Sequence, residues 1–159
     1  MAASPIAVSP LARHREHLPL LASWFQQEWP AWYGPGGRGD AATDLQSFAS
    51  SESVLPVGLV VLREGIPIGT GALKPESLPT HLHLSPWAGA GFVLPAFRGR
   101  GVGAMLLGAL VSHARGLGYS SVYCATGTAI SLLRRCGWSE FERTEHEGES
   151  LVIFQSTTA

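Results

Sequence analysis

The sequence predicts an α/β (α+β) fold around one mixed, mostly antiparallel central sheet of six or seven strands flanked by about four helices. Paired apolar runs separated by short polar turns indicate hairpins at residues 56–73 and 138–155. Between them, an apolar run, an amphipathic segment and a second apolar run indicate one right-handed parallel crossover. The 159 residues are 45% hydrophobic, which suits a single domain over residues 1–159 with one sizeable core.

The first half of the chain is expected to hold a strand, two helices and a hairpin. Apolar residues recur at helical spacing from Leu18 to Phe25. The glycine-rich residues 34–40 have the composition of a loop, and Asp40 is placed to cap the helix that follows. The expected elements are a strand at 5–9, helices at 18–28 and 41–50, and strands at 56–62 and 66–73.

The second half is expected to hold the crossover and the last hairpin. Its clearest helix follows the central strand, with Val102, Leu106, Leu110, His113 and Leu117 on one face. The expected elements are a loop at 75–86, a strand at 87–94, a helix at 101–117, a strand at 120–125, a helix at 128–135, and strands at 138–143 and 151–155 around a polar turn at 145–149.

Composition narrows the function classes. A formal net charge of −1 argues against general binding to nucleic acid or to a membrane surface. The sequence contains no run of 18 apolar residues, so no transmembrane helix is expected. The start Met-Ala-Ala-Ser-Pro does not indicate a signal peptide. The two cysteines, Cys124 and Cys136, form no CxxC motif and are expected to be reduced thiols, with Cys124 buried in a strand. These features predict a cytoplasmic protein.

A glycine-rich turn joins the central strand to the long helix. Gly99, Gly101 and Gly103 alternate with Arg98 and Arg100. Glycines let backbone N–H groups approach a ligand, and the first N–H groups of a helix have no internal partner. The turn therefore predicts a site for a phosphate or pyrophosphate.

Two well-known phosphate-binding motifs with such a turn do not fit this sequence. A P-loop requires a lysine after its last glycine, and none follows here. A dinucleotide-binding turn requires an acidic residue about 20 positions later, whereas residues 77–139 contain no Asp or Glu at all. The same stretch holds five arginines, which favours a highly anionic ligand.

The residues of the turn resemble the GNAT superfamily of N-acetyltransferases. Arg98, Gly101 and Gly103 match its pattern Arg/Gln-x-x-Gly-x-Gly/Ala. Residues 93–101, Val-x-Pro-x-Phe-Arg-Gly-Arg-Gly, are typical of its strand end and turn, and residues 129–138 are similar to its short fourth helix and the strand after it. The resemblance extends over roughly residues 5–155, and bacterial members are the most similar.

The resemblance implies that the turn binds acetyl-CoA. Phe92 and Val93 would line the pantetheine arm through their main chain, with Arg98 beside the pyrophosphate and Thr126 where the family often has Asn. The pyrophosphate would lie on the backbone N–H groups of Gly99, Arg100, Gly101, Val102, Gly103 and Ala104.

The resemblance also implies direct attack by a neutral amine on the acetyl thioester, polarised by a main-chain N–H of the central strand. The family often protonates the leaving thiolate with a tyrosine, and Leu133 stands at that position. Water, or one of the residues Ser131, Tyr123 and Cys136, would then supply the proton.

The general base is also not identified by the resemblance, because residues 87–94 contain no ionisable side chain. Glu28 and His83 are the candidates in flanking segments, with His81 as a third.

Aromatic side chains near Glu28 predict the acceptor site. Trp29, Trp32 and Tyr33 lie at a proline-containing helix end, and aromatic walls beside a carboxylate suit a cationic amine. No metal is expected, because the pairs His14-x-x-His17 and His81-x-His83 have no further ligands at a recognisable spacing.

The sequence therefore predicts an N-acetyltransferase that moves the acetyl group of acetyl-CoA to a primary amine of a small molecule or peptide. The alternative is a CoA-binding protein with little or no transferase activity. The acceptor is not identified, and a homodimer is among the assemblies left open.

Overall fold

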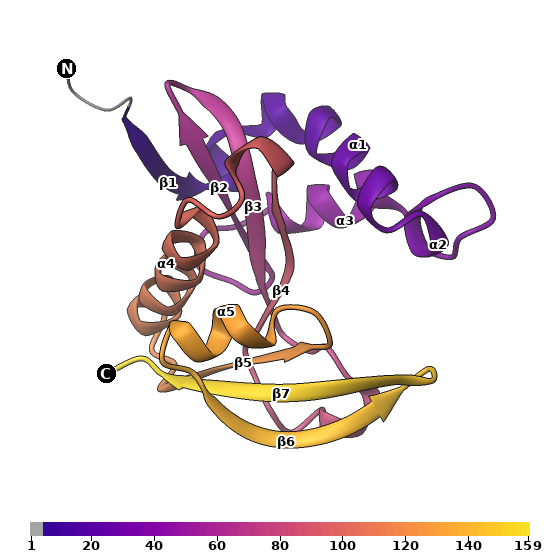
Figure 1. Ribbon diagram of the computed structural model, residues 1–159. Coiled ribbons are helices and arrows are strands. Elements are labelled where there is room, and N and C mark those ends of the chain that lie inside the picture. Colours follow the sequence, from indigo (N-terminus) through magenta and orange to yellow (C-terminus); the bar gives the residue numbers. More distant parts are fainter. Residues whose placement is uncertain (1–4) are drawn as a thin grey trace.

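A seven-stranded sheet organises the chain. The computed structural model describes residues 5–159. Residues 1–4, on which the expectation of no signal peptide depends in part, lie outside the described residues. The strand order is β1-β2-β3-β4-β5-β7-β6 (Figure 1). The strands are β1 Ile6–Pro10, β2 Val57–Arg63, β3 Ile66–Lys74, β4 Trp87–Val93, β5 Ser121–Thr126, β6 Ser139–His146 and β7 Glu149–Thr157.

All neighbouring strands pair antiparallel except β4 and β5, which are parallel. Parallel strands need a crossover, and α4 (Val102–Gly116) supplies it. The predicted mixed, mostly antiparallel sheet is thus confirmed. The remaining helices are α1 Leu18–Glu28, α2 Pro30–Tyr33, α3 Ala41–Phe48 and α5 Ile130–Arg135.

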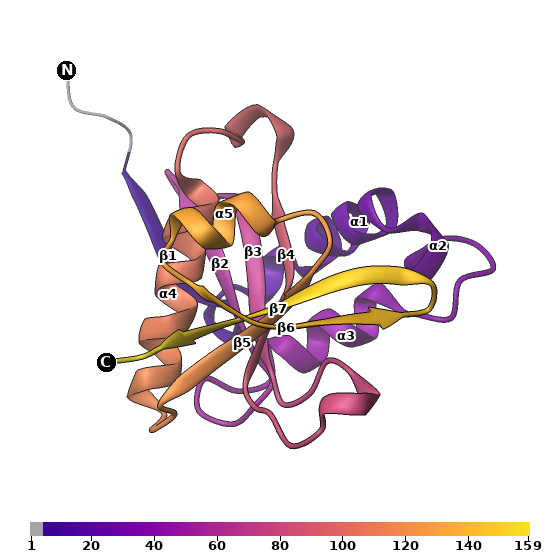
Figure 2. The same cartoon turned by 60° about the horizontal axis from the view of Figure 1, so that its bottom comes forward.

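The helices cover the two faces of the sheet (Figures 1 and 2). On one face, Leu21 and Phe25 of α1 and Leu45 of α3 pack with Val60 of β2 in one buried cluster. On the other face, α4 buries Val102, Leu106, Leu110 and Ala114 in a second cluster. Each fully buried aliphatic or aromatic side chain contributes about 1.5–3 kcal/mol, so these clusters hold the strands and helices together.

A third, smaller cluster joins the long loop before β4 to the sheet. Leu78 and Leu84 of the long loop pack on Trp87 of β4 and Ile153 of β7. No helix among residues 5–159 has the length and apolar character needed to cross a membrane.

Several boundaries differ from the expectation for local reasons. Helix α5 begins at Ile130 rather than at residue 128, because Thr126 Oγ1 caps the N–H groups of Thr128 and Ala129. The last hairpin is longer than predicted, because Glu147 and Gly148 alone form its turn, both with positive φ. The buried face of α4 ends with Ala114 rather than with His113. His113 is half-buried at the edge of this face, and its ring donates to the Glu52 carbonyl.

Candidate active site

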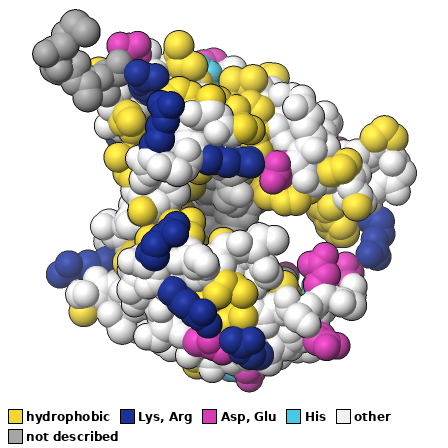
Figure 3. Space-filling model, viewed as in Figure 1, with side chains coloured by type: hydrophobic (Ala, Val, Ile, Leu, Met, Phe, Trp, Pro, Cys, Tyr) yellow, Lys and Arg dark blue, Asp and Glu magenta, His cyan; other side chains and the backbone are white. Residues whose placement is uncertain are grey.

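The sheet opens between its two parallel strands. Trp87 of β4 lies opposite Tyr123 of β5, and the Tyr123 N–H donates to the Pro86 carbonyl at 3.0 Å. Beyond this point β4 continues along β3 to Val93, and β5 continues along β7 to Thr126. Within residues 5–159 no further pair joins β4 to β5, so the two strands diverge. Figure 3 shows a deep hollow between the parts of the molecule that contain them.

A β-bulge interrupts β4 beside this opening. Gly89 pairs with Ala72 and Phe92 with Thr70, so Ala90 and Gly91 together face a single residue of β3. Ala90 has φ +52, a left-handed conformation that non-glycine residues rarely adopt. Bulges leave a residue outside the regular ladder and often lie next to active sites. The bulge was not predicted, and its one sequence signal is the run of small residues Ala-Gly-Ala-Gly at positions 88–91.

The glycine turn lies at the C-terminal end of β4, as the sequence predicts. Gly99 has φ +74 and Gly101 has φ +83, so both need the left-handed conformation. Gly101 immediately precedes α4 and provides no side-chain cap; the first bond of the helix runs from the Met105 N–H to the Gly101 carbonyl. The N–H groups of Val102, Gly103 and Ala104 therefore have no acceptor within the helix. Such a terminus favours an anion.

Arg98 is held beside the turn by three contacts. Its Nε donates to the Val93 carbonyl at 2.8 Å, and its guanidinium lies 5.3 Å from the centre of the Phe92 ring. One terminal nitrogen lies 3.6 Å from a carboxylate oxygen of Glu28. The structure thus brings together Phe92, Val93 and Arg98, which the sequence assigned to the donor side, and Glu28, which it assigned to the acceptor side.

Helix α5 packs against the first turn of α4. A Cβ on Gly103 would lie 3.1 Å from Cδ2 of Leu132, so a larger residue here would require a small shift of the Leu132 side chain. Leu133, at the position of the family's tyrosine, is buried in the core cluster under α4. Thr126 is buried, and its hydroxyl accepts the two N–H groups of the turn before α5. Leu133 is therefore a packing residue, and Thr126 has a clear role in local structure.

A pocket of about 500 Å³ lies between two segments distant in the sequence. One wall is the end of α1, α2 and the loop after it, with Glu28, Trp29 and Trp32. The other wall is the turn of the β6–β7 hairpin, with Glu147 and Glu149. Figures 1 and 2 show the hairpin tip and α2 on the same side of the molecule.

An ion pair crosses the pocket. Arg38, from the loop after α2, lies 3.4 Å from Glu147 of the hairpin and 5.6 Å above the ring of Trp32. A Cβ on Gly39 would lie 2.3 Å from Nε1 of Trp32, so this glycine lets the loop fold back over the ring. The lining contains three carboxylates and one guanidinium. In Figure 3 acidic side chains gather at the right of the hollow, around the hairpin tip.

Two predicted residues lie outside this pocket. The Tyr33 hydroxyl donates to Asp44 of α3 at 2.6 Å, and its ring stacks on Phe25. Burial, followed by the Asp44 hydrogen bond, raises the Tyr33 pKa well above its usual range. His83 is exposed in the loop before β4 and stacks on His81, which pairs with Glu142 of β6. Tyr33 therefore ties α2 to α3, and the structure does not bring His83 to Glu28.

Two further side chains that can react or carry a charge lie in or beside the two parallel strands. Cys124 is half-buried, and desolvation raises the pKa of its thiol to about 12, which disfavours the thiolate that a nucleophile requires. Lys74, at the end of β3, lies across β4, with Nζ 4.0 Å from the position of a Cβ on Gly89. It is the one lysine of the chain, which is the signal that could have singled it out.

Comparison with known proteins places this geometry in a family. The model of the acetyltransferase (GNAT) family matches residues 20–138, which include the split strands and the glycine turn. No curated protein matches the chain.

Many solved structures share the fold. The chain is similar to an aminoglycoside 6′-N-acetyltransferase complexed with coenzyme A, at TM-score 0.77 and 11% identity over 96% of this chain and 97% of that one. It is also similar to yncA from Salmonella typhimurium with acetyl-CoA, at TM-score 0.73 and 16% identity over 99% and 95% of the two chains. A ribosomal-protein-alanine N-acetyltransferase from Brucella melitensis gives TM-score 0.70 and 21% identity over 96% and 99%.

The family match extends over most of the chain, and the fold, the diverging strands and the glycine turn agree with it. The chain belongs to the acetyltransferase (GNAT) family and is an acetyltransferase whose cosubstrate is acetyl-CoA.

Proposed function

We propose that the protein transfers the acetyl group of acetyl-CoA to a primary amine of a cationic small molecule or peptide. The observation that carries this proposal is the arrangement of two unlike sites on either side of the Arg98–Glu28 pair. One side is the uncapped helix terminus after β4, suited to the anionic cosubstrate. The other side is an aromatic pocket rich in carboxylates.

On the donor side, the main chain does the binding. The N–H groups from Gly99 to Ala104 would hold the pyrophosphate, and Arg98 would add a positive charge beside it. The main chain of Phe92 and Val93 would bind the pantetheine arm along the free edge of β4, which has room because β5 has diverged. Thr126 would lie across the opening, at the end of β5.

The bulge in β4 would polarise the thioester. Ala90 and Gly91 lie outside the regular β3 ladder, so an N–H here is available to the acetyl carbonyl oxygen as negative charge develops on it. The amine nitrogen bonds to the carbonyl carbon, the carbon–sulfur bond breaks, and the electron pair leaves on the sulfur as thiolate. The amine loses one proton, and the thiolate gains one.

We assign the base role to Glu28 rather than to His83. Glu28 lines the acceptor pocket and contacts Arg98 of the donor side, whereas His83 has its ring contact with His81. The leaving thiolate would take its proton from water, because Leu133 is buried and apolar. Tyr123, the nearest alternative on β5, has its hydroxyl 3.4 Å from Gln155 and its ring against Trp87.

The charges of the pocket support a cationic acceptor. Arg38 already places a guanidinium over Trp32 and beside Glu147, the position that a cationic amine would take. Glu28 and Glu149 leave two more carboxylates in the same lining. A polycationic amine would therefore be favoured over an amine with a neutral or acidic tail.

The experiment mixes the protein and acetyl-CoA with linear polyamines, an aminoglycoside, a basic peptide and an acidic peptide, and follows free thiol. We expect thiol release with the cationic amines, strongest with those of highest charge, and little with the acidic peptide. If none of the amines causes thiol release although acetyl-CoA binds, the result would instead favour a CoA-binding protein. The supporting observation for that alternative is the buried Leu133 at the position of the family's tyrosine.

The proposed base is tested in the same assay. Glu28→Gln should lower kcat, whereas His83→Gln should leave kcat unchanged. A large loss of kcat in His83→Gln with none in Glu28→Gln would reverse the assignment.

A further inference from the structure

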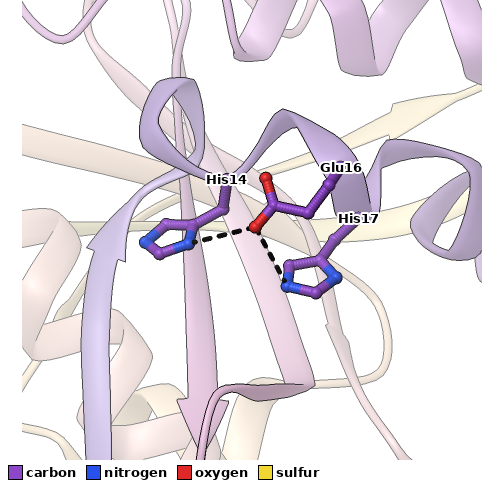
Figure 4. Close-up of side chains that lie close together, drawn as sticks. All are labelled: His14, Glu16 and His17. Atoms are coloured by element: carbon purple, nitrogen blue, oxygen red, sulfur yellow. Dashed lines mark ion pairs between the residues drawn. The ribbon is translucent and has the colours of Figure 1, made fainter.

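Three metal-ligand side chains converge in the connection between β1 and α1, a region that the proposed function does not use. His14 Nδ1 lies 3.8 Å from Glu16 Oε1, and His17 Nε2 lies 3.5 Å from the same oxygen. All three ligand atoms lie within 4.8 Å of one another. Figure 4 shows both imidazole rings turned toward the Glu16 carboxylate.

The backbone brings the two histidines to one side. Two short 3₁₀ turns, Leu11–Arg13 and Arg15–His17, meet at His14. The His17 N–H donates to the His14 carbonyl at 3.1 Å, so residues three apart lie above one another. The rings are nearly parallel at 16°, with centroids 6.3 Å apart. Glu16 projects between them because it belongs to the same turn as His17.

The neighbouring arginines do not neutralise this carboxylate, since both are engaged elsewhere. Arg13 pairs with Glu52 at 2.7 Å, and Arg15 donates to the Ala49 carbonyl at 2.9 Å. The ion-pair partners of Glu16 are His14 and His17. Arg13 and Arg15 therefore do not occupy the Glu16 carboxylate, and one of its oxygens lies near both imidazoles.

The hydrogen bond of His14 is compatible with metal binding. Its Nε2 lies 3.0 Å from Ser9 Oγ. Metal-bound histidines usually donate their other ring N–H to such an acceptor, which fixes the ring and its tautomer. With the proton on Nε2, the lone pair of Nδ1 faces Glu16. His14 Nδ1, His17 Nε2 and Glu16 Oε1 then offer three ligand atoms within 4.8 Å of one another.

The spacing suits zinc. With bonds of about 2.0–2.1 Å, neighbouring ligand atoms of a tetrahedral Zn²⁺ lie about 3.3 Å apart. Two of the three distances here, 3.5 and 3.8 Å, exceed this value by a few tenths of an ångström. Imidazole and carboxylate ligands suit Zn²⁺, Co²⁺ and Ni²⁺ better than Mg²⁺ or Ca²⁺. The histidine side chains are about one quarter exposed, so water can fill the fourth position.

We propose that His14, Glu16 and His17 form a binding site for a divalent transition metal of the Zn²⁺ type. The ion would join the end of β1 to the start of α1 and so stabilise the fold on the face that carries α1. The site takes no part in acetyl transfer, since none of its three residues lines the pocket or belongs to the glycine turn. It stands whether or not the proposed acceptor is correct.

The test titrates chelator-treated full-length protein with Zn²⁺ by calorimetry at pH 7.5, and with Co²⁺ followed by visible absorption. We expect one equivalent of Zn²⁺, a rise in Tm, and the absorption bands of four-coordinate Co²⁺. His14→Gln, His17→Gln and Glu16→Gln should each weaken Zn²⁺ binding at least tenfold. Glu16 is exposed, so Glu16→Gln should fold normally and keep the test valid if a histidine variant does not.

The matched control is His146→Gln. His146 Nε2 lies 3.9 Å from Glu147, a similar pair that has no third ligand in the described residues. This variant should bind Zn²⁺ like the unmodified protein. Absence of Zn²⁺ binding at millimolar concentration, or binding that survives in both His14→Gln and Glu16→Gln, would overturn the proposal.

Discussion

The two sides of the candidate active site are built by different means. The donor side consists of backbone groups contributed by neighbouring residues, from the bulge at Ala90 to the first turn of α4. The acceptor side consists of side chains from segments more than a hundred residues apart, joined by the Arg38–Glu147 pair. The donor side depends on dihedral angles that a short motif can specify, and the acceptor side depends on how the hairpin and α2 meet.

This difference has a consequence for substitutions. On the donor side a change matters when it alters the backbone, and most side chains can be exchanged. On the acceptor side a single charge or ring changes what is recognised, while the fold barely responds because these groups are exposed. Donor and acceptor binding should therefore be separable by mutation.

The largest effect is expected at the glycine turn. Gly101 has φ +83, and a residue with a β-branched side chain cannot adopt this conformation without a cost of more than about 1–2 kcal/mol. Gly101→Val should therefore move the N–H groups of the helix terminus and raise the Kd for acetyl-CoA at least tenfold, measured by calorimetry.

Gly108→Ala is the matched control, because Gly108 is exposed in the same helix and a Cβ there meets nothing within 4 Å. It should bind acetyl-CoA normally and gain up to about 1 kcal/mol of stability. A folded Gly101→Val protein with unchanged affinity would show that the turn does not hold the cosubstrate.

The next effect separates two aromatic residues that the sequence assigned to the acceptor side. Tyr33→Phe removes a hydrogen bond to the Asp44 carboxylate and should lower the free energy of unfolding by about 1.5–3 kcal/mol, with KM for the amine unchanged. Trp32 is 44% exposed, so Trp32→Ala should change stability little and raise KM. Chemical denaturation and thiol-release kinetics measure both, and the reverse pattern would restore Tyr33 to the acceptor site.

A smaller effect is expected for the ion pair across the pocket. Exposed pairs contribute about 0.2–1 kcal/mol, so Glu147→Gln should raise KM for a cationic amine by about two- to fivefold. Arg38→Ala removes a competing cation and should lower KM by a similar factor. Steady-state kinetics with one polyamine measures both; equal changes in the same direction would mean that the pair only holds the hairpin in place.

The effect expected to be smallest at neutral pH concerns Cys124 of β5. Burial raises its pKa to about 12, above the ordinary thiol value of about 8.5. The folded state therefore keeps the proton, and the stability from this group is fully present below about pH 8.5 and is lost as the pH rises toward 12. Cys124→Ala should flatten the fall in stability between pH 8.5 and 10, measured by denaturant titration. An unchanged fall would mean that Cys124 ionises in the folded protein.

Much of the fold follows from local pattern. The helix face from Val102 to Leu110, the hairpin of β2 and β3 and the glycine turn each depend on residues close in sequence, so their periodicity was enough to predict them. The lining of the pocket beside α2 follows from the sequence only in part. Trp29, Trp32 and Glu28 were identified from one segment, whereas Glu147 and Glu149 carry no local signal that links them to it.

Two features that the sequence did not indicate have the same source. Tyr33 follows Trp32 directly, yet the short helix α2 turns it to α3, where Asp44 accepts its hydroxyl. His14 and His17 showed no third ligand in their spacing, because the reach of Glu16 between them depends on two 3₁₀ turns that no periodicity indicates. In each case neighbouring residues face different directions, and the direction is a property of the packed backbone.

The sequence by itself predicted an anion-binding turn, because closely spaced glycines at a helix start and the absence of acids over residues 77–139 are local features that favour a phosphate group. Acetyl-CoA was implied by the resemblance of the same residues to the GNAT family. The tertiary structure alone decided where β4 and β5 separate, that Glu28 contacts Arg98, and which carboxylates face Trp32. Those features require distant segments to meet, and burial of the apolar clusters, rather than the polar residues of the site, brings them together.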